Sequence, residues 1–255
     1  MSGWATLEVD REEAIVFVRL DRPEARNALN LQMCLDLRDC FEVLAAEDEV
    51  RVVVIEGNGP VFCAGADLKE RDGKDAAWVR RRRLAAFAAY RAIEIFPKPA
   101  FALAHGPVIG SGGEICLSSD FILASTEATF RFPEPQWGTV GATQRLQRAI
   151  GKSSAKELLF TGRTMGAAEA LQRGLVARCV EPGELKKIGR EMAEAIAAAP
   201  AQAMRLTKQA VDLGNRTDLE TGLRIELAAI EQNLASGEWQ QGVRAFSKHM
   251  ATKSK

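Results

Sequence analysis

Two glutamates stand in glycine- or proline-rich surroundings where their side chains could do acid–base chemistry. Glu114 closes the segment 110–114 (GSGGE), where an apolar strand gives way to the expected start of a helix. Glu134 lies between two prolines at the end of another expected strand, in the segment 132–135 (FPEP). Two carboxylates beside free backbone N–H groups can hold a water molecule, transfer protons and stabilise an oxyanion. The pair therefore predicts a reaction site.

Both glutamates also have ordinary structural interpretations. Ser111 and Glu114 fit a capping box, in which the glutamate folds back onto the serine N–H at the start of a helix. That N–H would then be unavailable as an oxyanion donor, so the two interpretations compete. Glu134 also fits a solvated loop acid, the usual situation of a glutamate. Pro135 restricts Glu134 to an extended backbone, which suits an aimed side chain.

The elements that must position these residues alternate along most of the chain. Apolar and β-branched runs predict strands at 14–20, 51–57, 101–105 and 121–125. Apolar residues at helical spacing predict helices at 29–46, 76–95 and 152–160. This alternation favours an α/β fold of stacked units.

The strand pattern stops near residue 199. Amphipathic helices are predicted beyond it, at 201–213, 219–234 and 239–250. Such helices can cover the core or pack against another subunit. We therefore divide the chain into a core, residues 1–198, and a helical C-terminal region, residues 199–255.

The composition argues against several classes of protein. The 255 residues can bury a substantial core, and 34 acidic residues balance 34 basic ones, so neither nucleic acid nor a membrane is expected as a partner. We find no secretory signal and no apolar run long enough to span a membrane. The five scattered cysteines form no CxxC pair, which is typical of reduced thiols in a cytoplasmic protein and predicts no metal site.

Several motifs, taken in order, resemble the crotonase (enoyl-CoA hydratase/isomerase) superfamily. The resemblance spans roughly residues 15 to 250 and rests on 63–70 (CAGADLKE), GSGGE, FPEP, Gly138-Thr139 and 143–146 (TQRL). Within the superfamily, 62–71 (FCAGADLKER) and 203–226 most resemble the methylglutaconyl-CoA hydratase branch.

The resemblance implies a spiral of ββα units with C-terminal helices that form a trimer or a dimer of trimers. It implies acyl-CoA thioester substrates and no cofactor, because coenzyme A is part of the substrate. Glu114 and Glu134 match the two hydratase glutamates, and the N–H groups of Ala66 and Ser111 match the oxyanion donors. Substrate and CoA contacts are expected at Arg26, Ala28, Ala64, Asp67, Leu68, Lys69, Phe246 and Lys248.

Hydration of a 2-enoyl thioester suits these residues. Water attacks C3, negative charge develops on the thioester oxygen, and two N–H donors stabilise that charge. Because two nearby carboxylates do not both ionise readily, one is expected to have a raised pKa and act as the acid. We hypothesise that Glu134 is the acid toward C2 and Glu114 the base toward water. The expected activity is that of an enoyl-CoA hydratase acting on a short or branched substrate.

The chain departs from the family pattern in three places. The loop 140–142 (VGA) is shorter than the usual glycine-rich loop, which makes hydration itself less secure. Ser111 stands where glycine is common, and 246–249 (FSKH) replaces a more basic pattern. A Δ3-Δ2-enoyl-CoA isomerase, which needs one working carboxylate, is the alternative within the superfamily.

A non-catalytic RNA-binding protein or structural oligomer is the alternative from another class. The run 80–83 (RRRR) could bind RNA or the CoA phosphates, although such a run is more often a solvated helix face. Trp78 and Phe87 are expected either in the acyl pocket or in the core.

Overall fold

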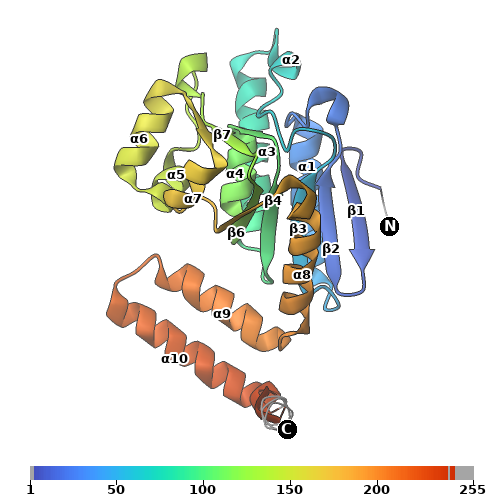
Figure 1. The fold of residues 1–255 in the computed structure, drawn as a ribbon, viewed down its shortest axis with the longest axis vertical. Helices are drawn as coiled ribbons and strands as arrows, with labels where there is room; N and C mark the ends of the chain where they lie inside the picture. The colour runs from blue at the N-terminus through green and yellow to red at the C-terminus, as the bar shows by residue number, and fades with distance from the viewer. Residues whose placement is uncertain (1–2, 241, 245–255) are drawn as a thin grey trace.

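The computed structural model describes residues 3–240 and 242–244 and has a central sheet covered on both faces by helices (Figure 1). The six strands lie in the order β1-β2-β3-β4-β6-β9, and all neighbours are parallel except β1 and β2. Their bounds are β1 Leu7–Glu12, β2 Ile15–Leu20, β3 Val52–Gly57, β4 Ala100–Ala104, β6 Phe121–Ser125 and β9 Arg178–Val180.

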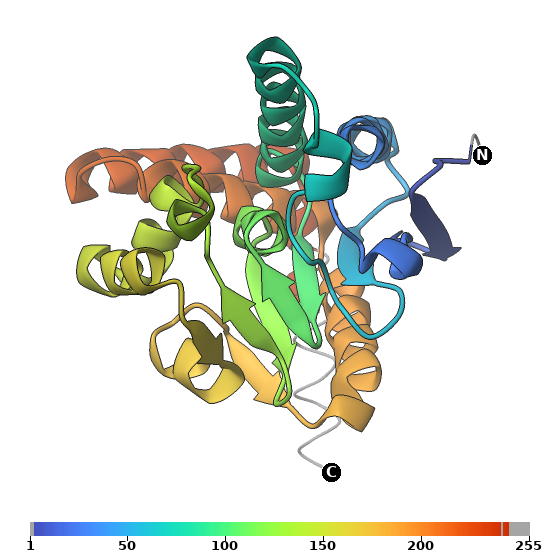
Figure 2. The ribbon, with the colours of Figure 1, turned by 90° about the horizontal axis from the view of Figure 1, so that it is seen from above.

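The apolar runs of the central strands exist because both faces of the sheet are buried. In β3, Val53 and Ile55 face one core cluster, whereas Val52 and Val54 face the other. The first cluster is shared with α1 (Leu31–Ala46) and α3 (Ala76–Glu94), and the second with α8 (Leu185–Ala198) (Figure 2). The predicted α/β class and the four predicted strands are confirmed.

A smaller sheet carries the site-forming loops. It pairs β5 (Pro107–Ile109) with β7 (Thr129–Arg131), and β7 with β8 (Thr164–Gly166). The helices around it are α2 (Leu68–Arg71), α4 (Ser111–Ser118), α5 (Thr143–Ile150), α6 (Lys152–Thr161) and α7 (Ala167–Gln172). Short 3-10 helices lie at η1 (Pro23–Ala25), η2 (Pro135–Trp137) and η3 (Pro182–Glu184).

The C-terminal helices α9 (Ala201–Gly214) and α10 (Leu219–Ser236) form a hairpin that stands away from the sheet (Figure 1). The structure confirms the two predicted helices in this part. It also leaves Leu219, Leu223 and Leu227 exposed on α10, none of whose residues is buried. The third predicted helix, 239–250, lies largely outside the described residues, as do Phe246 and Lys248.

Two further findings concern the described residues. They include no helix long and apolar enough to cross a membrane. All five cysteines are free, and four of them are buried.

Candidate active site

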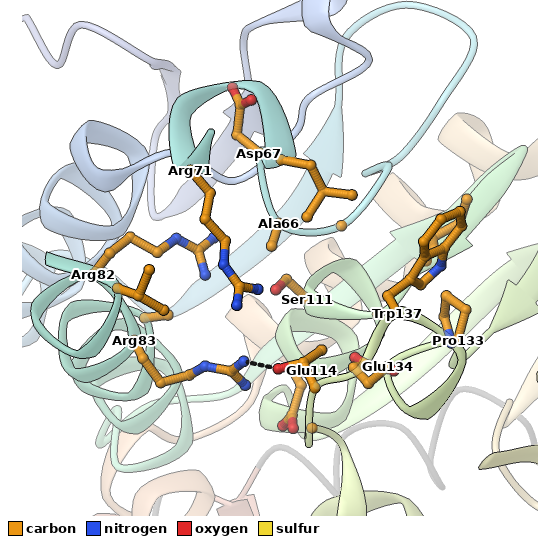
Figure 3. Close-up of a pocket in the computed structure, with 18 of the residues that line it drawn as sticks. Ala66, Asp67, Arg71, Arg82, Arg83, Ser111, Glu114, Pro133, Glu134 and Trp137 are labelled. Atoms are coloured by element: carbon orange, nitrogen blue, oxygen red, sulfur yellow. Dashed lines mark hydrogen bonds between the residues drawn. The ribbon is translucent and has the colours of Figure 1, made fainter. Parts of the chain in front are cut away.

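The parallel pairing of β5 and β7 places the two glutamates at neighbouring strand ends. Ile109 is paired with Arg131, and the Gly110 N–H donates to the Arg131 carbonyl at 2.8 Å. Helix α4 begins directly after β5 and carries Glu114, while the chain after β7 reaches Glu134. Both side chains line one pocket together with Ala66 and Ser111 (Figure 3).

Gly110 is required at this junction for two reasons. Its φ of +47° lies in the left-handed region, which side chains other than glycine rarely adopt. A Cβ at this position would also lie 2.9 Å from Glu134 Oε1. Glycine therefore lets the start of α4 approach the Glu134 carboxylate closely.

The Glu114 carboxylate is buried and held at both oxygens. Oε1 accepts a hydrogen bond from the Ala142 N–H at 2.7 Å, and Oε2 pairs with the Arg145 guanidinium at 2.8 Å. The alternative interpretation of Ser111 and Glu114 as a capping box is therefore excluded. The N-cap of α4 is Gly110, and the glutamate side chain turns from the helix start to an ion pair, which is the stronger interaction.

Glu134 has a helical backbone and not the extended one that Pro135 predicts. Its φ and ψ are −52° and −47°, and its carbonyl accepts hydrogen bonds from Trp137 at 3.1 Å and from Thr139 at 3.0 Å. These bonds offset the unfavourable geometry before a proline. The prediction of an extended backbone is therefore wrong.

The Glu134 side chain is half-buried, and one of its carboxyl oxygens lacks a hydrogen-bond partner. Its Oε2 is buried and has no hydrogen bond to any residue that the structure describes. Burial raises the pKa of the Glu134 carboxyl, and the neighbouring Glu114 charge raises it further, whereas a hydrogen bond from the backbone of Glu134 itself and the charge of Arg83 oppose the shift. Glu134 is thus not a solvated loop acid.

The two expected donors are free of other hydrogen bonds within residues 3–240 and 242–244. Ser111 is the first residue of α4, where a helix N–H has no partner inside the helix. On either side of Ala66, the Leu29 N–H donates to the Gly65 carbonyl and the Asp67 N–H donates to the Leu29 carbonyl. That alternation turns the Ala66 N–H away from Leu29, and Ala66 itself lines the pocket.

Comparison with known proteins supports what this geometry suggests. Residues 10–253 match the family described as enoyl-CoA hydratase/isomerase. The chain belongs to this family. It is 36% identical to "Probable enoyl-CoA hydratase 2, mitochondrial" of Arabidopsis thaliana, over 92% of this chain and 80% of that protein.

Solved structures of the enoyl-CoA hydratase/isomerase family agree with the fold. The enoyl-CoA hydratase of Bacillus anthracis superposes with a TM-score of 0.93 at 35% identity, covering 95% of this chain and 96% of that one. A putative enoyl-CoA hydratase of Thermobifida fusca YX was solved in complex with acetoacetyl-CoA. It superposes with a TM-score of 0.83 at 29% identity, covering 91% of this chain and 96% of that one. The predicted superfamily, crotonase-like fold and enoyl-CoA hydratase-type enzyme are confirmed at the level of the family.

The other expected contacts of this family member fall into two groups. Ala64, Asp67 and Leu68 line the pocket, together with Trp78 and Phe87, whereas Arg26, Ala28 and Lys69 do not line it. The Asp67 carboxylate is already engaged, because it caps α2 and pairs with Arg22 at 3.0 Å.

The arginine run in α3 divides between surface and site. Arg80 and Arg81 are exposed, as a solvated face predicts. Arg82 is buried and donates to the Leu29 carbonyl, while Arg83 donates to Thr139 Oγ1 and to the Val140 carbonyl, each at 2.6 Å. The helical period of 3.6 residues could have predicted which arginines face the pocket. It places residues 79, 82, 83 and 86 on one face of the helix, and all four line the pocket.

Three arginines without an ion pair line the pocket. Arg71, Arg82 and Arg83 line it, and none forms an ion pair with a carboxylate of the described residues (Figure 3). Of the three lining acids, Asp67 is paired with Arg22 and Glu114 with Arg145, while Glu134 forms no ion pair with the described residues. Sequence reasoning missed Arg71 and Arg145, which lie in recognised motifs but were given no role.

Proposed function

We propose that this protein adds water reversibly across the 2,3-double bond of a short or branched enoyl-CoA. The observation that carries the proposal is the convergence of Glu114 and Glu134 on one pocket beside the unbonded N–H groups of Ala66 and Ser111. The family membership and the acetoacetyl-CoA complex of the Thermobifida relative support an acyl-CoA ligand. No metal or separate cofactor enters the proposed reaction.

Each group has a defined part in the reaction. The thioester oxygen accepts hydrogen bonds from the Ala66 and Ser111 N–H groups. Glu114, which is paired with Arg145, takes a proton from water as the water oxygen bonds to C3. The electrons of the double bond move toward the thioester oxygen, and Glu134 then delivers its proton to C2. The raised pKa of Glu134 suits it to this acidic role.

The short loop does not separate the glutamates from the rest of the pocket. Ala142, its last residue, donates directly to Glu114, and Gly141 lies against Glu134. The same contacts favour Δ3-Δ2-enoyl-CoA isomerisation as a second candidate, because they occupy both Glu114 oxygens and leave Glu134 as the carboxyl without a partner. An isomerase needs only one such group.

One assay separates the two candidates. The protein is incubated with crotonyl-CoA and, separately, with trans-3-hexenoyl-CoA, and the products are identified by mass spectrometry. We expect loss of enoyl absorbance and a gain of one water molecule with crotonyl-CoA. Conversion of the 3-enoyl substrate to the 2-enoyl isomer without hydration of crotonyl-CoA would contradict the hydratase proposal and support the isomerase.

The unpaired arginines favour an acyl group that carries a negative charge. Arg71 projects into the pocket, and no acid of the described residues neutralises it (Figure 3). The resemblance to the methylglutaconyl-CoA hydratase branch, whose acyl group has a free carboxylate, agrees with this charge. We therefore include acidic 2-enoyl-CoA esters in the proposal as the preferred substrates.

Replacing Arg71 with methionine is expected to discriminate between charged and neutral substrates. A lost charge-assisted hydrogen bond of about 2 kcal/mol lowers kcat/KM for glutaconyl-CoA roughly 30-fold. The value for 5-methylhex-2-enoyl-CoA, which has a neutral group of similar shape, should change little. Arg81→Met, at an exposed arginine outside the pocket, is the control. An equal loss on both substrates would instead assign Arg71 to the CoA moiety.

The helical C-terminal region, residues 199–255, is proposed to mediate self-association as a trimer or a dimer of trimers. The exposed apolar side chains of α9 and α10 support this assignment, since Val211, Leu219 and Leu223 are each more than half exposed. A cytoplasmic location is part of the same proposal.

A further inference from the structure

Arg145 contacts three side chains next to the two glutamates. Its guanidinium pairs with Glu114 Oε2 at 2.8 Å, reaches Glu94 Oε2 at 3.5 Å, and lies 5.6 Å from the centre of the Tyr90 ring. The side chain is only 16% exposed, and that of Glu114 is 7% exposed. An arginine held by two carboxylates and an aromatic ring has little freedom to move, so it can fix the orientation of Glu114.

The short loop provides the second anchor of the same carboxylate. Ala142 is the N-cap of α5, and its N–H donates to Glu114 Oε1 at 2.7 Å. Ala142 and Arg145 are three residues apart, so both belong to the first turn of α5 and reach the carboxylate together. Arg83 holds the preceding loop residues from α3. Together these contacts tie α5 to the start of α4.

Glu134 lacks such anchors. Its Oε2 has no hydrogen bond to the part of the chain that the structure describes, although it lines the same pocket. The site is therefore asymmetric: one carboxylate is fixed by a cation and an amide, and the other is free to exchange a proton.

We infer that Arg145 is a positioning residue that fixes the orientation of the Glu114 side chain and thereby aims it at the proton of the attacking water. This inference rests on the proposed hydratase function. Arg145 touches no reacting atom in this scheme and acts through Glu114. Proton transfer at C2 belongs to Glu134 and the two oxyanion donors, so it does not depend on Arg145.

Two reactions of the same protein test this division. Hydration of crotonyl-CoA needs both glutamates, whereas exchange of the C2 protons of butyryl-CoA in deuterated water needs only Glu134 and the oxyanion donors. Arg145→Met is expected to lower kcat for hydration about 100-fold, the usual contribution of a general base. KM for crotonyl-CoA and the rate of C2 exchange should stay within about threefold of the unaltered protein, since neither depends on the orientation of Glu114.

Two further variants make the result interpretable. Arg145→Lys keeps a cation but not the forked geometry, so we expect it to recover hydration to within about tenfold. This variant also tests the inference if the methionine variant does not fold. Arg148→Met removes an exposed arginine one turn along α5 and should retain hydration within about threefold.

The possible outcomes separate the inference from the function. An equal fall of hydration and C2 exchange in the Arg145 variants would show a general structural role and overturn the inference. Unchanged hydration in those variants would overturn it as well. Absence of hydration by the unaltered protein on every enoyl-CoA would overturn the proposed function, and the inference with it.

Discussion

The Glu134→Gln variant is expected to lose hydration of crotonyl-CoA by about 10³-fold in kcat. Glutamine has the size of glutamate but can neither deliver a proton to C2 nor accept one in the reverse direction. The pocket walls and the two oxyanion donors are left in place, so KM should change little. C2 exchange of butyryl-CoA should fall with hydration, unlike in the Arg145 variants. A Glu134→Gln protein with near-normal turnover would contradict the assignment of the acid.

The same substitution is expected to stabilise the fold at neutral and mildly alkaline pH. Burial raises the pKa of Glu134, so the folded protein binds more protons than the unfolded chain between the ordinary and the raised value. Stability therefore decreases as pH rises through that interval, and glutamine removes this loss. At pH values above this interval, we expect the Tm of the variant to be about 2 °C higher than that of the unaltered protein. The Tm of the variant should also depend less on pH. Glu191→Gln, at an exposed glutamate of α8, is the control.

Glu114→Gln offers a matched contrast. It also removes a carboxylate to which we assign a catalytic role, but it breaks the ion pair with Arg145 and leaves a largely buried guanidinium without its main partner. We therefore expect a loss of stability of roughly 2 kcal/mol together with the loss of hydration. Glu134→Gln should therefore stabilise the fold and Glu114→Gln should destabilise it, because only Glu114 is held by a cation. Stability changes of equal sign would contradict the asymmetry of the site.

Long elements with a clear period were predictable from the sequence, and short ones were not. The strand at 52–57 has six buried residues in succession, so its apolar run marks it unambiguously. In contrast, β5, β7, β8 and β9 have three residues each and exist because neighbouring strands pair with them. Strand β1 carries alternating charged residues and gains its place from pairing with β2. A pattern within one segment cannot reveal such pairing.

The candidate site was predictable where local chemistry was unusual. The glycines before Glu114 and the prolines around Glu134 marked both acids, because a strained or constrained backbone is uncommon around an ordinary surface glutamate. The partners of these acids were not predictable. Arg145 is 31 residues from Glu114 in the sequence, and only the folded chain brings the first turn of α5 against it. The capping-box and extended-backbone expectations failed for the same reason, since tertiary contacts overrode local preferences.

The two segments that carry the proposed oxyanion donors meet at Gly112. A Cβ at this position would lie 2.7 Å from the Cβ of Cys63 and 2.8 Å from the Cys63 carbonyl oxygen. Cys63 leads within three residues to Ala66, and Gly112 follows Ser111 directly. Because the clash involves backbone, Gly112→Ala must push the Ala66 and Ser111 N–H groups apart.

We therefore expect Gly112→Ala to lower kcat for hydration about 10²- to 10³-fold, as loss of one oxyanion donor does. Overpacking should also cost about 2 kcal/mol of stability, measured by urea unfolding. C2 exchange of butyryl-CoA should fall with hydration, because both reactions pass through an enolate held by the same two donors. Gly183→Ala is the matched control, since a Cβ there meets no atom within 4 Å. If the folded Gly112→Ala protein kept both activities, the thioester oxygen could not be bound between Ala66 and Ser111, and the proposed reaction would lose its electrostatic basis.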